Sequence, residues 1–247
     1  MSLAPPATEP SLLPARLREP GYAIVDAAGV ARLSGVRTGD FNALNATWDA
    51  LPPDEYLRDG GRYRRRRHAC YVADSGQIGR VPRRPHWQPV EYNALHGGIE
   101  RWFEPLAPAW DESGAWPALL GGLVATADTL RGARPWYIEA HQFRIDTAGG
   151  IGRPTPEGAH RDGVDFVAVL LIARHGVKGG ETRVFDADGP QGIRFTMAQP
   201  WSMLLLDDAR VIHETTPIQP ADAPEGDAQG HRDTLVITLR AGGFQGR

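Results

Sequence analysis

One stretch of the chain decides the fold: residues 157–172 read EGAHRDGVDFVAVLLI. It starts as a glycine-containing loop, passes through His160 and Asp162, and continues as an apolar segment of the kind that forms buried strands. His160 and Asp162 are two residues apart, so on an extended chain both side chains point to the same face. An imidazole and a carboxylate on one face provide two ligands of a metal site, and a third ligand must come from elsewhere.

His213 is the candidate third ligand, because it follows the apolar segment 202–206 and a short Asp207-Asp208 turn. Two imidazoles and one carboxylate form the facial triad of non-haem Fe(II) oxygenases, which leaves positions open for a cosubstrate and O2. A closed four-ligand zinc site would fill those positions. An isolated His-x-Asp pair is usually an ordinary structural feature, so the prediction depends on the combination with His213 and on the residues that follow it.

Arg232 and Thr234 come 19 and 21 residues after His213 (232 − 213 and 234 − 213) and open an expected strand. Their spacing places a guanidinium and a hydroxyl on one face of that strand. This pair suits one carboxylate of a dicarboxylate ligand, because arginine binds carboxylates in a bidentate, charge-assisted manner.

The rest of the sequence favours a β-rich fold over a helix bundle, since it has 29 Gly, 21 Pro and many short apolar runs. We expect a mostly β (α+β) jelly roll or barrel with supporting helices from the N-terminal half. We expect residues 1–20 to be disordered or loosely attached and 21–247 to form a single domain, with a metal-binding core at about 136–241. Strands are expected at 22–25, 62–72, 136–145, 165–173, 181–185, 193–197, 201–206, 211–213 and 233–239, and helices at 11–18, 38–51, 98–106 and 116–130.

Two further polar segments are candidates for binding. Residues 62–67 read RYRRRR, and strand alternation would put Arg65 and Arg67 on one face, where they could reach an anionic group of the substrate. The alternatives are a solvated edge strand or a nucleic-acid patch. In the expected strand 136–145, Gln142 or Arg144 is a candidate to line the pocket and bind the cofactor.

Charge and cysteine content exclude some classes of protein. The net charge of −3 gives no overall attraction for nucleic acid or membranes. Cys70 is the single cysteine, so no intramolecular disulfide forms and a cytoplasmic location is expected. The N-terminal residues MSLAPP do not resemble a signal peptide, and no transmembrane segment is predicted.

Taken together, His160-x-Asp162, the distal His213 and Arg232-x-Thr234 resemble the signature of the 2-oxoglutarate/Fe(II)-dependent dioxygenases. The similarity is closer to a bacterial branch that includes free L-isoleucine hydroxylases and a biofilm- and stress-linked protein. It extends over most of the chain from about residue 20 and includes residues 63–71, 141–144, 179–181 and 211–217. The loop from His213 to Arg232 is longer than is usual in the superfamily, which leaves Arg240 and Arg144 as substitutes for Arg232.

The resemblance implies a double-stranded β-helix, a cupin-like jelly roll. It implies Fe(II) bound by His160, Asp162 and His213, and 2-oxoglutarate bound by Arg232 and Thr234. The expected reaction consumes O2, hydroxylates a small molecule such as a free aliphatic L-amino acid, and yields succinate and CO2. Related halogenases have a small residue in place of the carboxylate, so the presence of Asp162 favours hydroxylation. The alternatives are a cupin-like metal-dependent hydrolase or isomerase and a nucleic-acid-binding jelly roll that uses residues 62–67.

Overall fold

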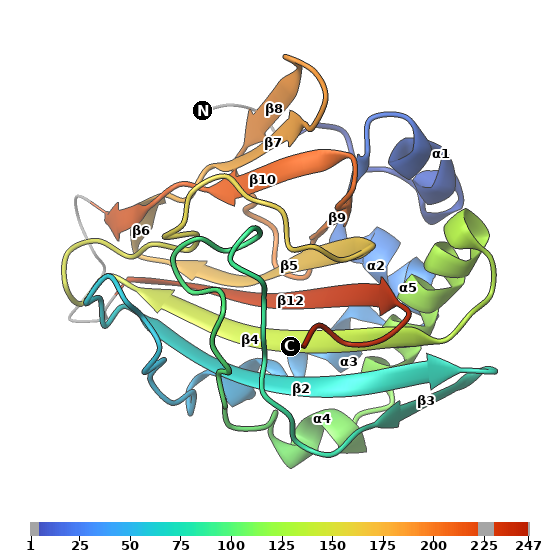
Figure 1. Cartoon of the computed structure of the whole chain (residues 1–247), viewed down its shortest axis with the longest axis horizontal. Coiled ribbons are helices and arrows are strands. Elements are labelled where there is room, and N and C mark those ends of the chain that lie inside the picture. Colours follow the sequence, from blue (N-terminus) through green and yellow to red (C-terminus); the bar gives the residue numbers. More distant parts are fainter. Residues whose placement is uncertain (1–4, 222–229, 247) are drawn as a thin grey trace.

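A seven-stranded antiparallel sheet forms the centre of the molecule, and its strands follow the order β1-β9-β5-β12-β4-β2-β3 (Figure 1). The computed structural model describes residues 5–221 and 230–246. The seven strands are β1 (Tyr22–Val25), β2 (Arg64–Asp74), β3 (Gln77–Arg80), β4 (Trp136–Asp146), β5 (Phe166–His175), β9 (Met203–Asp207) and β12 (His231–Ala241). The chain thus pairs strands from its N-terminal half with strands from its C-terminal half.

Two smaller antiparallel sheets complete the β structure. One has the order β10-β7-β8 and consists of β10 (Val211–Thr215), β7 (Thr182–Asp186) and β8 (Gly192–Phe195). The other pairs β11 (Ile218–Pro220) with β6 (Val177–Gly179). An apolar cluster that includes Val167 of β5, Val184 of β7 and Val211 of β10 joins the large sheet to the three-stranded sheet. The described part of the chain is therefore mostly antiparallel β-sheet and jelly-roll-like, as predicted.

Helices cover the opposite face of the large sheet (Figure 1). They are α1 (Leu13–Arg18), α2 (Ala27–Ser34), α3 (Thr38–Asn42), α4 (Pro108–Glu112) and α5 (Ala115–Arg131), with short 3-10 turns at η1 (Pro10–Leu12) and η2 (Asn45–Trp48). In α5, Leu119, Leu120 and Leu123 follow the spacing of one helix face and are buried against the sheet. Within the described residues, no helix has the length and apolar character needed to cross a membrane.

Strand alternation separates the helix-covered face from a cavity on the other face. In β12, Leu235 and Ile237 belong to the helix-side core, whereas Arg232 and Thr234 line the cavity. The same division holds in β4, where Ile138 and Ala140 are in the helix-side core and Glu139 and His141 line the cavity. The strands β2, β4 and β12 of the large sheet therefore contribute polar side chains to a single cavity.

The structure corrects three local predictions. The expected helix 38–51 is divided into α3 and η2, in a segment that contains Gly39, Asn42 and Asn45, which are weak helix formers. No helix forms at 98–106, where Arg101 instead pairs with the backbone of His86 in an isolated bridge.

The N-terminal segment is also held more firmly than expected. Leu13 and Leu17 of α1 are fully buried in the helix-side core, so this part of 1–20 is not loosely attached. Residues 1–4, and residues 222–229 of the long loop before Arg232, lie outside the described residues.

Candidate active site

His160, Asp162 and His213 lie together at one side of the cavity. His160 is in the loop before β5, and His213 is on β10; their backbones form an antiparallel bridge with N···O distances of 3.0 and 2.9 Å. Asp162 Oδ1 lies 3.9 Å from His160 Nε2, and Asp162 Oδ2 lies 3.7 Å from His213 Nε2. Both separations are below about 4.2 Å, the largest distance possible between two atoms that each lie about 2.1 Å from one ion. The three predicted residues therefore fit a metal.

The protonation of the two imidazoles agrees with this fit. His160 Nδ1 lies 3.0 Å from the Gly158 carbonyl and donates to it, which leaves the Nε2 lone pair for a metal. Burial lowers the pKa of His213, and the adjacent His160 lowers it further. Burial opposes protonation of His160 as well, but the carboxylates of Asp162 and Glu157 outweigh it and raise the pKa of that ring. The negative charge here favours a cation.

Asp208 fixes the loop that carries Asp162. Its carboxylate accepts backbone N–H bonds from Asp162, Gly163 and Val164 at 3.0, 2.8 and 3.1 Å. Burial, together with the nearby charge of Asp162, raises the pKa of Asp208 to about 6. Gln88 Nε2 donates to Asp162 Oδ1 at 3.1 Å. The metal-facing carboxylate is thus oriented by neighbours that are not themselves in the metal-binding group.

Arg232 is a buried cation whose donors are not all used. It is 3% exposed, and its Nε and Nη2 have no hydrogen-bond partner among the described residues. Burial, followed by repulsion from Arg174, lowers its pKa to about 10, so it stays charged near neutrality. Thr234, also 3% exposed, lines the same cavity. A buried guanidinium with free donors beside a hydroxyl fits a carboxylate ligand.

The two substitutes for Arg232 do not line the cavity. Arg240 donates to the Gly243 carbonyl at 2.6 Å. Arg144 lies on the other face of β4, where it pairs with Asp233 at 2.8 Å and Asp49 at 3.1 Å. The long loop before β12 therefore does not displace Arg232 from the position that the sequence predicts.

A second group of cations, on β2 and in the segment between β3 and α4, lines the same cavity. Arg64, Arg66 and Arg101 are nearly fully buried and line the cavity. Arg64 bonds to Asp54 at 2.7 Å, and Arg66 lies between the rings of Phe103 and Phe143, 3.8 and 4.4 Å from their centroids. Each of the three arginines keeps one buried nitrogen without a partner among the described residues, namely Arg64 Nη2, Arg66 Nε and Arg101 Nε.

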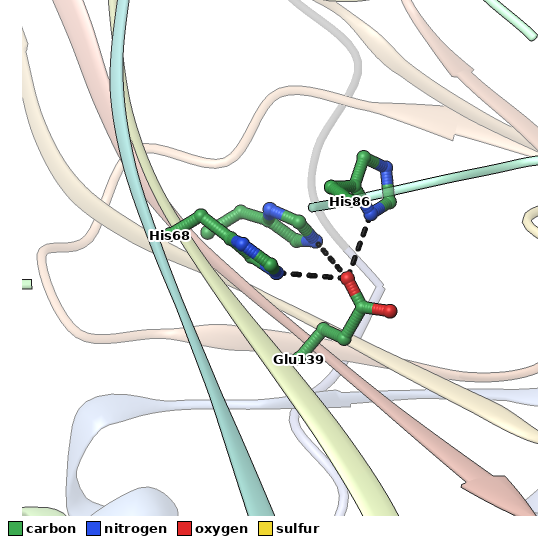
Figure 2. Close-up of side chains that lie close together, drawn as sticks. His68, His86 and Glu139 are labelled. Atoms are coloured by element: carbon green, nitrogen blue, oxygen red, sulfur yellow. Dashed lines mark hydrogen bonds and ion pairs between the residues drawn. The ribbon is translucent and has the colours of Figure 1, made fainter. Parts of the chain in front are cut away.

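A buried group of histidines surrounds Glu139 between β2 and β4 (Figure 2). Glu139 Oε2 accepts hydrogen bonds from His68 Nε2 at 2.8 Å and His86 Nδ1 at 2.7 Å, and His141 Nε2 lies 3.7 Å away. Burial alone would raise the pKa of Glu139, but His86 and His68 hold it below its ordinary value. Burial lowers the pKa of His86 to about 4, and it lowers the pKa values of His68 and His141. The carboxylate is therefore ionised and the imidazoles are neutral.

Two predictions from the sequence placed the cavity-facing residues on the wrong face of a strand. On β2, Arg65 and Arg67 point away from the cavity and reach the carbonyls of Leu51 and Ala50, whereas Arg64 and Arg66 face inward. Because Arg64 and Arg66 are buried, they do not form a surface patch for nucleic acid.

On β4, Gln142 is fully buried on the helix side and donates to Thr47 Oγ1, and Arg144 shares that side. The prediction that Gln142 and Arg144 bind the cofactor is therefore wrong, since neither residue lines the cavity. His141 and Phe143 occupy the inward positions of β4 instead.

Sequence reasoning missed the Glu139 group. The alternation of Glu139 with His141 could have indicated this group, but the residue that lies opposite them on β2 depends on the strand register. His68 stands directly opposite His141 in the β2–β4 pair, and their rings stack 4.6 Å apart. His86 joins from a loop with no regular spacing to either strand.

The sequence and the fold of this chain are similar to those of known proteins. Residues 45–238 match the family model described as 2OG-Fe dioxygenase. The crystal structure of a bsmA homolog from Methylobium petroleophilum PM1 is 54% identical, with a TM-score of 0.92 over 98% of this chain and 96% of that one. No curated protein matches the sequence.

More distant structures share the fold. IDO from Bacillus thuringiensis has a TM-score of 0.76 at 13% identity, over 98% of this chain and all of its own. The Fe(II)/α-ketoglutarate-dependent dioxygenase TqaL has a TM-score of 0.70 at 19% identity, over 94% of this chain and 86% of its own. The family match covers most of the chain, and the chain therefore belongs to the 2OG-Fe dioxygenase family, enzymes that use Fe(II), 2-oxoglutarate and O2.

Proposed function

We propose that this enzyme hydroxylates a free aliphatic L-amino acid and releases succinate and CO2. His160, Asp162 and His213 hold Fe(II), which supplies the oxidising chemistry when 2-oxoglutarate and O2 are bound. Arg232 and Thr234 hold the far carboxylate of 2-oxoglutarate. We also propose that the β structure is a double-stranded β-helix and that the enzyme belongs to the branch of free L-isoleucine hydroxylases that the sequence resembles.

The observation that carries the proposal is the position of the unpaired Arg232 guanidinium in the same cavity as the His160, Asp162 and His213 group. A metal-dependent hydrolase or isomerase has no need of a buried cation kept free for a dicarboxylate. The cavity also provides a second anion site, since Arg64, Arg66 and Arg101 line it with unused donors. We assign this second site to the carboxylate of the substrate.

The apolar part of the cavity lining suits an aliphatic side chain. Val164, Val169 and Val236 line the cavity, as do Phe143 and Ile145. Burial of a branched aliphatic side chain against such a surface contributes about 1.5–3 kcal/mol to binding. A small molecule with one carboxylate and one aliphatic branch therefore matches the lining.

Product analysis tests this function directly. The iron-loaded enzyme is incubated with 2-oxoglutarate, O2 and each common L-amino acid, and the products are analysed by mass for a gain of one oxygen atom. We expect the gain for a branched aliphatic amino acid, with one succinate formed per hydroxylated product. Succinate release that no amino acid stimulates, with no oxygenated product, would remove the proposed substrate class.

A further inference from the structure

The group formed by His68, His86, Glu139 and His141 has no role in holding iron or 2-oxoglutarate, although three of its members line the cavity. Histidines and a carboxylate within bonding distance are a common metal site. They are also a common way to hold a carboxylate in one orientation. The hydrogen-bond geometry decides between these two possibilities.

Arg66 determines the tautomer of His141. Arg66 Nη2 lies 2.7 Å from His141 Nδ1, and a guanidinium can only donate, so Nδ1 must accept. A neutral imidazole that accepts at Nδ1 carries its proton on Nε2, the nitrogen that faces Glu139. His141 therefore presents an N–H group, and not a lone pair, to the centre of the group.

The ring geometry also argues against a metal. His68 and His141 are stacked with an interplanar angle of 13°. The lone pairs of parallel rings run side by side and do not converge on one ion. In addition, His68 and His86 approach the same carboxylate oxygen to 2.8 and 2.7 Å, which are hydrogen-bond distances.

The histidines engage one oxygen of Glu139 and leave the other free. Both hydrogen bonds go to Oε2, and no donor is bonded to Oε1 among the described residues. Figure 2 shows this second oxygen pointing away from the labelled imidazoles, with no dashed line to it. The carboxylate is thus an ionised acceptor with unused capacity beside the cavity.

We propose that Glu139 binds the ammonium group of the substrate through Oε1, with His68, His86 and His141 as positioning residues. This ammonium site rests on the proposed amino-acid substrate and recognises the amine of that substrate. Arg66 and Glu139 lie on opposite sides of the His141 ring, so a cation and an anion of the protein are held one imidazole apart. The carboxylate and ammonium of an α-amino acid are separated by one carbon and carry the complementary charges.

The variant Glu139→Gln tests this assignment. The Gln oxygen can accept the histidine N–H bonds, while its NH2 group replaces Oε1 and opposes an ammonium group with a donor. Glu104→Gln is the matched control, because Glu104 is an exposed carboxylate paired with Arg67. Binding is measured anaerobically from the change in the visible Fe(II)/2-oxoglutarate band, which also reports whether each variant is folded.

The probes are the common L-amino acids, 3-methylpentanoate, which is isoleucine without its amine, and 2-methylbutylamine, which is isoleucine without its carboxylate. We expect Glu139→Gln to weaken binding of the amino acid and of the amine roughly 10- to 100-fold. Binding of 3-methylpentanoate should not weaken, and Glu104→Gln should match the wild type. If Glu139→Gln does not fold, Glu139→Asp, which withdraws the oxygen by one methylene, should give the same pattern with a smaller change.

Three outcomes would overturn part of the account. Equal binding of an amino acid by the wild type and Glu139→Gln would remove the ammonium site and leave the proposed substrate class. If the wild type bound 2-methylbutylamine and Glu139→Gln did not, and neither protein bound any amino acid, the substrate class would be removed and the ammonium site would remain. Failure of both probe types would remove both.

Metal analysis provides an independent check. We expect one iron per chain in the iron-loaded enzyme and no change in His86→Asn. A second equivalent that is lost in His86→Asn would show that the group binds metal, and would overturn the ammonium site.

Discussion

Two groups of histidines and carboxylates share one cavity, and they differ in how their atoms face one another. In the first, His160, His213 and Asp162 keep their nitrogens and oxygens 3.7–3.9 Å apart. In the second, the imidazole nitrogens of His68 and His86 lie 2.7–2.8 Å from Glu139. Residue type alone would assign a metal to both. The shorter separations are hydrogen bonds, and His141 Nε2, which lies 3.7 Å from Glu139, carries a proton and not a free lone pair.

The neighbours of each group explain the difference. A backbone carbonyl accepts from His160 Nδ1 and leaves Nε2 free to bind a metal. A guanidinium donates to His141 Nδ1 and forces the proton onto Nε2. One hydrogen bond on the far side of an imidazole thus decides whether its near side is a metal ligand or a donor.

Removal of the carboxylate in each group should have the largest and most contrasting effects. Asp162→Ala should lose stoichiometric iron and all 2-oxoglutarate turnover, because it removes a proposed ligand. Glu139→Gln should keep one iron per chain. The measurement is iron content after anaerobic loading and desalting, with turnover followed by succinate. Loss of iron in both variants would mean that the two groups do not differ as described.

Asp54 should control stability in the region of the second group. Asp54 pairs with Arg64 at 2.7 Å and lies 3.8 Å from Arg66. Burial would raise the pKa of Asp54, but the two arginines outweigh burial and lower this pKa below 3.8. The stabilising effect of the Asp54 charge is therefore complete above pH 3.8, and it is lost as the pH falls through the lowered pKa. Asp54→Asn should cost about 3–5 kcal/mol at pH 7, as for other broken buried ion pairs.

The pH dependence provides the control for that prediction. The difference between Asp54→Asn and the wild type, measured by urea unfolding, should shrink below about pH 4, where the Asp54 carboxylate of the unfolded chain takes up a proton before that of the folded protein does. Asp40→Asn, in an exposed pair with Arg37, should change stability little at any pH. A constant difference from pH 7 to pH 3 would contradict the assigned role of the Asp54 charge.

Adjacent arginines on β2 test the face assignment with a smaller effect. Arg66→Ala should raise the KM for the amino acid about 10-fold or more, since it removes a charge from the cavity and the partner of His141. Arg65→Ala should change KM less than about twofold, because surface substitutions have small effects. Steady-state kinetics at saturating 2-oxoglutarate measures both. A larger effect of Arg65→Ala would restore the original prediction from the sequence.

The sequence predicted a face correctly where the two rows of a strand differ in polarity. In β12, Leu235 and Ile237 form an apolar row, so Arg232 and Thr234 had to face the other way. The segment before β5 was predictable for the same reason, since His160 and Asp162 precede a continuous apolar strand. These contrasts determined the mostly β fold and the metal-facing residues.

The faces of β2 and β4 were not predictable, because neither strand has that contrast. Residues 64–67 are all Arg, so the hydrophobic effect favours neither row. In β4, Gln142 and Arg144 alternate with His141 and Phe143, which leaves a polar group in both rows. The register that brings His68 opposite His141 depends on pairing across 73 residues (141 − 68) and is not encoded in local spacing.

The central claim is that Arg232 binds 2-oxoglutarate beside the iron site. It is tested most directly by anaerobic titration of the Fe(II)-loaded enzyme with 2-oxoglutarate, with the visible charge-transfer band as the signal. The comparison is between the wild type, Arg232→Ala and Arg240→Ala, an arginine on the same strand that bonds to Gly243 outside the cavity. We predict the band in the wild type and Arg240→Ala, with 2-oxoglutarate affinity at least about 10-fold weaker in Arg232→Ala. Equal affinity in all three proteins, or no band in the iron-loaded wild type, would contradict the account.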